Sequence, residues 1–153
     1  MKILRNSVLC VWATGIGLAQ VGADFGWTFQ NPRPTGNALR AVAALSAKTI
    51  IAVGEQGEIL RTTDAGVTWK RLSSGTAASL FGVSFTDANT GIAVGSQGAI
   101  LRTVDGGSTW TPEVSGTANS LFAVSFTDAD IGTAVGDEGT ILRTSDGGTT
   151  WSG

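Results

Sequence analysis

Residues 57–69 read G-E-I-L-R-T-T-D-A-G-V-T-W, and this stretch decides the fold because the chain contains it three times. It returns as G-A-I-L-R-T-V-D-G-G-S-T-W at 98–110 and as G-T-I-L-R-T-S-D-G-G-T-T-W at 139–151. The copies are 41 residues apart both times, with no gap between them. A fixed period of this length indicates a repeat architecture, so each position must be interpreted together with its two copies.

The two halves of the stretch predict a strand and a tight turn. Residues 100–103, Ile-Leu-Arg-Thr, form a short apolar and β-branched run between turn signals, which is typical of a strand. Residues 105–109 predict the turn, because Asp105 can accept hydrogen bonds from the N–H groups after it and glycine adopts positive φ without a steric cost. Trp110 then opens the next strand with a large apolar ring.

Each 41-residue unit has room for four short strands. In the second unit, residues 80–85 alternate Phe, Val and Phe with small residues, and residues 92–95, 99–103 and the segment from Trp110 supply three more strands. We therefore predict an all-β fold of β-propeller blades, with repeat units at about 39–79, 80–120 and 121–153. The repeated aromatic positions (Phe81, Phe85, Trp110 and their copies) are expected in the core.

Three repeats are fewer than the four to eight blades with which propellers typically close. We expect either a partial propeller that belongs to a longer one, which we favour, or a ring that closes when copies associate through their open edges. Residues 25–30 correspond to the segment after each turn, and this lone strand would suit the closing partner of a last blade.

The pattern T-x-D-x-G-x-T-W in every repeat resembles the Asp-box, or bacterial neuraminidase repeat. The resemblance implies a structural role for the boxes, which usually lie away from active sites in the families that carry them. A metal-binding or catalytic role for each Asp is the alternative, but repetition in every unit favours turn capping. The expected Asp-box residues are Thr62, Asp64, Gly66, Thr68, Trp69, Thr103, Asp105, Gly107, Thr109, Trp110, Thr144, Asp146, Gly148, Thr150 and Trp151.

Residues 1–23 predict a secretory signal peptide, followed by the repeat domain at 24–153. Lys2 and Arg5 form a basic start, an apolar run follows, and Val21-Gly22-Ala23 is a small-residue cleavage site. We expect an exported protein, in the periplasm or outside the cell. The single cysteine, Cys10, lies in this leader, so the mature chain is expected to have no thiol chemistry.

Charge argues against nucleic acid as a partner. Without Lys2 and Arg5, eight basic residues face twelve acidic ones, a net charge of −4. An acidic exported domain lacks the basic footprint that nucleic-acid binding requires.

The repeat unit and the opening W-T-x-Q-N-P-x-P-T-G-N together resemble the family of photosystem II stability/assembly factors and their bacterial relatives. The unit is L-x-x-V-x-F-x-D-x-x-x-G-x-A-V-G-x-x-G-x-I-L-R-T-x-D-G-G-x-T-W. The resemblance implies an exported, non-catalytic propeller that serves as a protein-interaction or assembly scaffold and needs no cofactor. In a phototroph it implies the thylakoid lumen and a membrane-protein assembly intermediate as the partner.

The same resemblance implies partner binding by an arginine-rich surface. Arg61, Arg102 and Arg143 occupy the family's I-L-R-T-x-D positions. They could instead each pair with a nearby carboxylate, such as the Asp-box Asp, and cover apolar surface with their stems. Lys70, Arg71, Arg33 and Arg40 would join such a surface only if the loops bring them together.

The alternative function is a carbohydrate-active propeller, or one that binds glycans or peptides, with a sialidase-like or sortilin-like fold. A sialidase uses a tyrosine nucleophile, and this chain contains no Tyr. A glycosidase with two carboxylates would have to use non-repeat acids, which we expect to be solvated loop residues. With no His and no Cys in the mature chain, no metal site and no catalytic triad are expected. The candidate acids are Glu113, Asp130, Asp137 and Glu138.

Overall fold

The structure is a computed structural model that describes residues 33–153. The expected signal peptide at 1–23, its cleavage site and the lone strand expected at 25–30 lie outside the described residues. A compact unit spans Pro34–Gly153. None of the described residues belongs to a helix long and apolar enough to cross a membrane.

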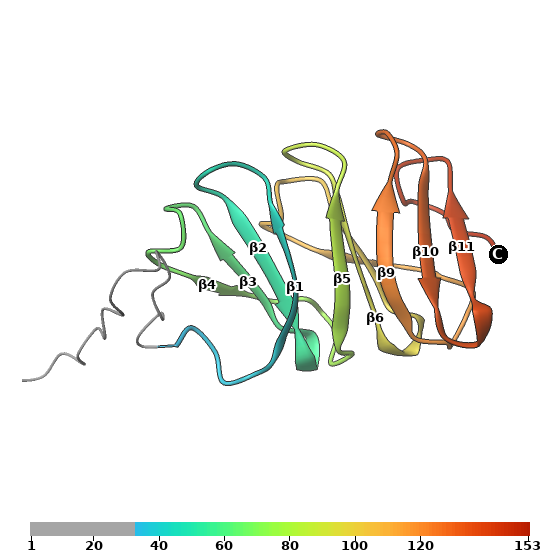
Figure 1. Ribbon diagram of the computed structural model, residues 1–153, viewed down its shortest axis with the longest axis horizontal. Helices are drawn as coiled ribbons and strands as arrows, with labels where there is room; N and C mark the ends of the chain where they lie inside the picture. The colour runs from blue at the N-terminus through green and yellow to red at the C-terminus, as the bar shows by residue number, and fades with distance from the viewer. Residues whose placement is uncertain (1–32) are drawn as a thin grey trace, which may run out of the picture. The chain divides into compact units, whose positions relative to one another are not determined.

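The described chain is all-β and forms three antiparallel sheets, as the repeats predict (Figure 1). Two sheets have four strands in chain order, and the third has three. The first sheet contains β1 (Leu39–Ala44), β2 (Ile50–Gly54), β3 (Ile59–Thr62) and β4 (Lys70–Leu72). The second contains β5 (Leu80–Phe85), β6 (Gly91–Gly95), β7 (Ile100–Thr103) and β8 (Thr111–Glu113). The third contains β9 (Leu121–Phe126), β10 (Gly132–Gly136) and β11 (Ile141–Thr144), and a single bridge joins Arg143 to Ser152.

The connection between the second and third strands of each blade is a short turn. It forms one 3₁₀ turn in each repeat: η1 (Glu55–Gly57), η2 (Ser96–Gly98) and η3 (Asp137–Gly139). In η2 both Gln97 and Gly98 have positive φ, of 58° and 68°. An added Cβ at Gly98 would lie 2.0 Å from the carbonyl oxygen of Thr117, so glycine is required there for space as well as for φ.

The core lies between the sheets, because each blade packs one face against the next. Ile51, Val53 and Ile59 of the first blade pack with Leu80, Ala93, Leu101 and Trp110 of the second. Ile92, Val94 and Ile100 of the second blade pack in the same way with Leu121, Ala134 and Leu142 of the third. Strands β1, β5 and β9 lie side by side, as Figure 1 shows, and they provide the closest approach between blades.

The repeated aromatic residues divide between the core and the surface. Phe85 packs edge-on against Trp110, with ring centroids 6.0 Å apart, and Phe126 packs on Trp151 in the same way. Phe81 and Phe122 instead contact each other across blades at 5.8 Å, and Phe122 is exposed. The expectation of a core position is therefore wrong for Phe122. The pairing register shifts between Leu121 and Ala123, as it does between Leu80 and Gly82, and this bulge takes Phe122 out of the inward alternation.

Candidate functional site

Each Asp-box closes its own turn with hydrogen bonds to both oxygens of the aspartate. In the second blade, Asp105 Oδ1 accepts from Thr103 Oγ1 at 2.8 Å and from the N–H groups of Ser108 and Thr109 at 2.9 Å. Asp105 Oδ2 accepts from Thr109 Oγ1 at 2.7 Å. Thr103 Oγ1 also accepts from the Gly107 N–H at 3.0 Å. The carboxylate is thus committed to local donors.

The first and third boxes repeat this geometry. Asp64 accepts from Thr62, from the Thr68 N–H and from the Thr68 hydroxyl, and Asp146 does the same with Thr144 and Thr150. The tryptophan that ends the box donates its indole N–H to the turn at Gly107 and at Gly148. Among the described residues, no box aspartate belongs to a cluster of three or more side chains that could hold a metal ion.

The hydrogen bonds hold the box aspartates in their charged form. The Thr68 hydroxyl and N–H, followed by Thr62, lower the pKa of Asp64 to about 2, and Thr150 and Thr144 act alike on Asp146. For Asp105, partial burial raises the pKa, but the bonds from Thr109, Thr103 and Ser108 outweigh it and the pKa is again about 2. A carboxylate of this kind is a poor general acid or base near neutral pH.

The arginines of the I-L-R-T strands connect one blade to the next. Arg61 Nε donates to the carbonyl oxygen of Gly106 at 2.9 Å, and Arg102 Nε donates to that of Gly147 at 3.0 Å. The expectation that they pair with carboxylates is wrong. In residues 33–153 the ion pairs are Arg40 with Glu55 and Arg71 with Glu58. The box aspartates are not available to these arginines, because their oxygens already accept hydrogen bonds from donors of their own turns.

A hollow of about 300 Å³ lies beside Arg61, between the first and second blades. Arg61 and Lys70 face each other in the register of β3 and β4, and both line it. The other lining residues are Thr63, Thr68, Leu72 and Ser108. Of the basic residues that the sequence left open, Lys70 therefore joins Arg61, whereas Arg40 and Arg71 are each engaged by a glutamate.

The corresponding hollow in the third blade is smaller and less basic. It measures about 230 Å³ and contains Arg143 as its one basic residue. Its other lining residues are Ile131, Thr144, Ser145, Thr150 and Ser152. Ser152 occupies the repeat position of Lys70, so the pairing of two basic side chains is a feature of the first blade.

Sequence reasoning missed a buried carboxylate, Glu58. Its Oε2 accepts hydrogen bonds from Asn37 at 2.7 Å and Thr35 at 3.1 Å, and lies 2.8 Å from Arg71 Nη2. Its Oε1 has no hydrogen-bond partner among the described residues. The available signal was a break in the repeat, since Ala99 and Thr140 occupy this position in the other two copies.

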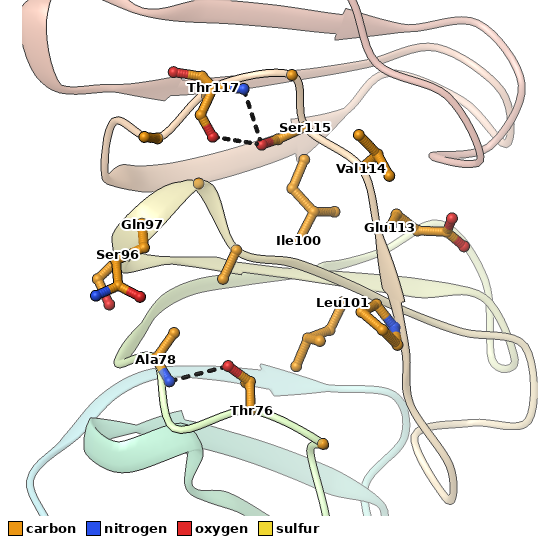
Figure 2. Close-up of a pocket in the computed structure, with 16 residues that line it drawn as sticks. Thr76, Ala78, Ser96, Gln97, Ile100, Leu101, Glu113, Val114, Ser115 and Thr117 are labelled. Carbon is orange, nitrogen blue, oxygen red and sulfur yellow. Dashed lines mark hydrogen bonds between the residues drawn. The ribbon is translucent and has the colours of Figure 1, made fainter.

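Another hollow, of about 580 Å³, lies beside the second blade and has a mixed lining, in which Ser96, Gln97 and Glu113 lie near Ile100 and Leu101 (Figure 2). Ala78 and Ala99 line this hollow. The same repeat positions in the third blade hold Asn119 and Thr140, and Asn119 Nδ2 donates a hydrogen bond to Thr140 Oγ1 there. Of the candidate acids, Glu113 alone lines it, while Asp137 and Glu138 lie on η3 and Asp130 follows β9. The hollow thus lacks the pair of carboxylates that a glycosidase requires.

Comparison with known proteins gives the same fold. A structure described as YCF48 bound to D1 peptide is 24% identical with a TM-score of 0.70, over 78% of this chain and 40% of that one. YCF48 from Cyanidioschyzon merolae is 23% identical with a TM-score of 0.68, over 79% and 41%. An ancestral GH74 enzyme is 19% identical with a TM-score of 0.63, over 74% and 18%. The comparison with curated proteins gives no match.

The chain spans about two-fifths of the length of the two YCF48 structures, which agrees with a partial propeller. The family model described as photosynthesis system II assembly factor YCF48 matches residues 19–104 and, in a second overlapping copy, residues 68–152. Together the two matches include all three Asp-boxes. The chain therefore belongs to the family of YCF48-like photosystem II assembly factors.

Proposed function

We propose that this protein is a non-catalytic, exported interaction module that receives an acidic segment of a partner protein at the hollow of Arg61 and Lys70. In a phototroph the partner would be an assembly intermediate of photosystem II. The observation that carries the proposal is the convergence of these two basic side chains, from adjacent strands, on one hollow lined by hydroxyl groups.

Charge and hydrogen-bonding capacity suit this hollow to a carboxylate. Arginine has five N–H donors, and the bond to Gly106 uses the one at Nε. That bond also fixes the guanidinium, so less side-chain entropy is lost when a ligand binds. Lys70 is exposed, and Thr63 adds a hydroxyl donor, whereas the hydroxyls of Thr68 and Ser108 already donate to Asp64 and Asp105. The chain as a whole has a net charge of −2, so an acidic segment would be drawn to this position and repelled elsewhere.

Family membership supports a protein partner. The name of one similar structure states that the YCF48 in it is bound to a D1 peptide. The absence of enzymatic activity is supported by the Asp-boxes, whose carboxylates are committed to turn donors, and by the separation of the other acids over different elements.

Peptide binding tests the proposal. A fluorescein-labelled peptide rich in Asp and Glu is titrated with the protein, and its anisotropy is recorded at low and at physiological salt. We expect Lys70→Thr, which installs the residue of the second blade (Thr111), to weaken binding about three- to tenfold and to reduce its salt dependence. The matched control is Lys48→Thr, because Lys48 is an exposed lysine in the turn before β2 and lines none of the hollows above.

Equal affinities for the Lys70→Thr and Lys48→Thr variants would contradict the proposed site. Binding of neutral glycans in place of the acidic peptide would instead support the carbohydrate-binding alternative. Export is tested separately by expression of the full chain in a bacterium, followed by N-terminal sequencing of the protein released from the periplasm. We expect that sequence to begin at Asp24, and full-length protein retained in the cytoplasm would contradict export.

A further inference from the structure

The hollow of about 580 Å³ lies at the end of the second blade that the Asp-box does not reach. Strand β7 begins at Ile100, just after η2, and ends at Thr103, where the Asp-box begins, so the hollow beside η2 and the box lie at opposite ends of this strand. Two connecting loops flank the hollow (Figure 2): residues 75–78 lead into the second blade, and residues 114–118 lead into the third. The hollow is therefore bounded on both sides by described parts of the chain.

The first blade, like the third, has a polar bridge at this end. Asn37 Nδ2 donates to Glu58 Oε2 at 2.7 Å, and these residues occupy the repeat positions of Ala78 and Ala99. The alanines cannot form the bridge, because a methyl group has no donor or acceptor. The corresponding hollow of the first blade measures about 410 Å³ and does not extend to the bridge residues, whereas that of the second blade extends to both alanines.

The first blade also shows which side chain fits a carboxylate at this end. Glu58 is 1% exposed, and its Oε2 lies 2.8 Å from Nη2 of Arg71. Arg71 is exposed and lines the hollow of about 410 Å³, so the guanidinium meets the carboxylate from the solvent side. Pro112 occupies the repeat position of Arg71, and the second blade therefore lacks this arginine.

Glu113 supplies a carboxylate to the second blade. It faces Ile100 in the register of β7 and β8, and it lines the hollow. It is half-buried, and none of the basic side chains in residues 33–153 forms an ion pair with it. The first blade has Leu72 at this repeat position. The second blade thus presents an acid at its hollow without the arginine that accompanies the acid of the first blade.

The other side chains at the hollow suit a peptide. Gln97 is exposed and lies on the side of the hollow opposite to Glu113 and Val114 (Figure 2). Its amide can both donate to and accept from a peptide group. Val114 is 83% exposed beside Glu113, so it offers apolar surface to the stem of a long basic side chain. The volume lies within the range of about 300–1,000 Å³ that is usual for ligand pockets.

We propose that this hollow binds an arginine-bearing segment of a partner protein, with the guanidinium on the carboxylate of Glu113 and the stem on Val114. Arginine is favoured over lysine because its planar fork bonds both oxygens of a carboxylate. The inference goes beyond the proposed function, since the hollow of Arg61 is lined by Thr68 and Ser108 of the Asp-box turns and takes the opposite charge.

Fluorescence anisotropy of two labelled peptides, titrated with the full chain, tests this proposal. One peptide carries a single Arg among Gly, Ser and Val, and the other has citrulline in its place, which retains the shape but has no charge. We expect the unsubstituted chain to bind the Arg peptide about three- to tenfold more tightly. Glu113→Gln should bind both peptides alike. The matched control is Glu138→Gln, because Glu138 is an exposed glutamate of η3 that does not line this hollow, and it should retain the preference.

A second variant tests the hollow itself. Ala78→Asn combined with Ala99→Thr installs the bridge of the third blade, so it should weaken the Arg peptide about tenfold while circular dichroism shows an unchanged fold. Unchanged affinity of this folded variant would overturn the proposal, because the arginine would then bind outside the hollow.

The remaining outcomes are equally decisive. Equal affinity of the unsubstituted chain for the two peptides would overturn the proposal, and so would an undiminished preference in Glu113→Gln. Lys70→Thr should bind the Arg peptide as the unsubstituted chain does, and Glu113→Gln should not weaken the acidic peptide. A failure at this hollow is therefore distinguishable from a failure at the hollow of Arg61.

Discussion

The second and third blades have nearly the same sequence but very different surroundings. Their strands carry Ile100 and Ile141 at one repeat position and Arg102 and Arg143 at another. In the second blade the isoleucine is buried against the third, and the arginine donates to Gly147. In the third blade both side chains are exposed. The comparison shows that in a repeat protein the energetic value of a residue depends on its neighbouring repeat.

The largest difference is expected for the pair of isoleucines. Ile100→Ala should destabilise the fold by about 2–5 kcal/mol, because it removes a buried side chain and leaves a cavity between blades. Ile141→Ala should cost less than about 1 kcal/mol, since its side chain is largely in water. Urea denaturation measures both, at a protein concentration where light scattering gives the mass of one chain. Equal costs would mean that the third blade is covered in solution by a part of the chain that the structure does not describe.

The Asp-box glycines give a second comparison, now between the first and second blades. Gly107 and Gly66 both have positive φ, of 75° and 87°, so alanine at either costs about 1–2 kcal/mol of backbone strain. Gly107→Ala should cost about 1–3 kcal/mol more, because the new methyl group collides with Ile51. Chemical denaturation of both variants gives the difference. Gly107→Ala should cost less in an Ile51→Ala background than in the unsubstituted chain, and an equal cost in the two backgrounds would exclude the collision as its cause.

These pairs also show what the sequence could and could not predict. The period of 41 residues and the alternation in residues 80–85 were sufficient for the all-β fold and the strands, because both patterns are local. The sequence also indicated the Asp-box turn, since its donors and acceptor lie within a few residues of one another. The partner of Arg61 was not predictable, because Gly106 is 45 residues away and is a backbone group that any residue could supply.

The hollow beside Arg61 could be predicted in part from the sequence. Lys70 was a candidate, but its pairing with Arg61 depends on the register of β3 and β4, which the sequence did not specify. Glu58, which lies between η1 and β3, was missed because a charged residue beside a short surface turn is normally solvated. Its oxygen Oε2 is contacted by Thr35, Asn37 and Arg71, which lie in other segments of the chain.

The arginines provide a third and smaller comparison. Arg102→Met retains an apolar stem but removes the donor to the carbonyl oxygen of Gly147. The free energy of unfolding should fall by about 1 kcal/mol. This is less than for a fully buried charged hydrogen bond, because Arg102 is partly exposed to water. Arg143→Met should change the stability of a single chain by close to zero, because that arginine is exposed. Thermal and urea denaturation check both values. If Arg143→Met were the more destabilising, the assignment of the arginine as a connection between blades would be wrong.

The smallest effects are expected from the titration of the box aspartates. Hydrogen bonds lower the pKa of Asp64, Asp105 and Asp146 from 3.8 to about 2 in the folded chain. A depressed pKa contributes stability that is complete above pH 4 and is lost as the pH falls toward 2. The urea midpoint should therefore be nearly constant from pH 7 to pH 5 and decline between pH 4 and pH 2. Asp87 and Asp128, whose pKa values are also lowered by hydrogen bonds from the N–H groups after them, contribute in the same direction.

A variant that cannot titrate at one box separates this effect from general acid denaturation. Asp105→Asn retains an oxygen that can accept from the Thr109 N–H but carries no charge, so it should be less stable at pH 7. Its midpoint should then fall less between pH 4 and pH 2 than that of the unsubstituted chain, because one of the three box carboxylates with a lowered pKa is gone. Asp137→Asn is the matched control, since Asp137 lies on η3 outside every box. An identical acid profile for Asp105→Asn and Asp137→Asn would mean that the boxes stabilise the blades by the geometry of their turns alone, with no contribution from the charge.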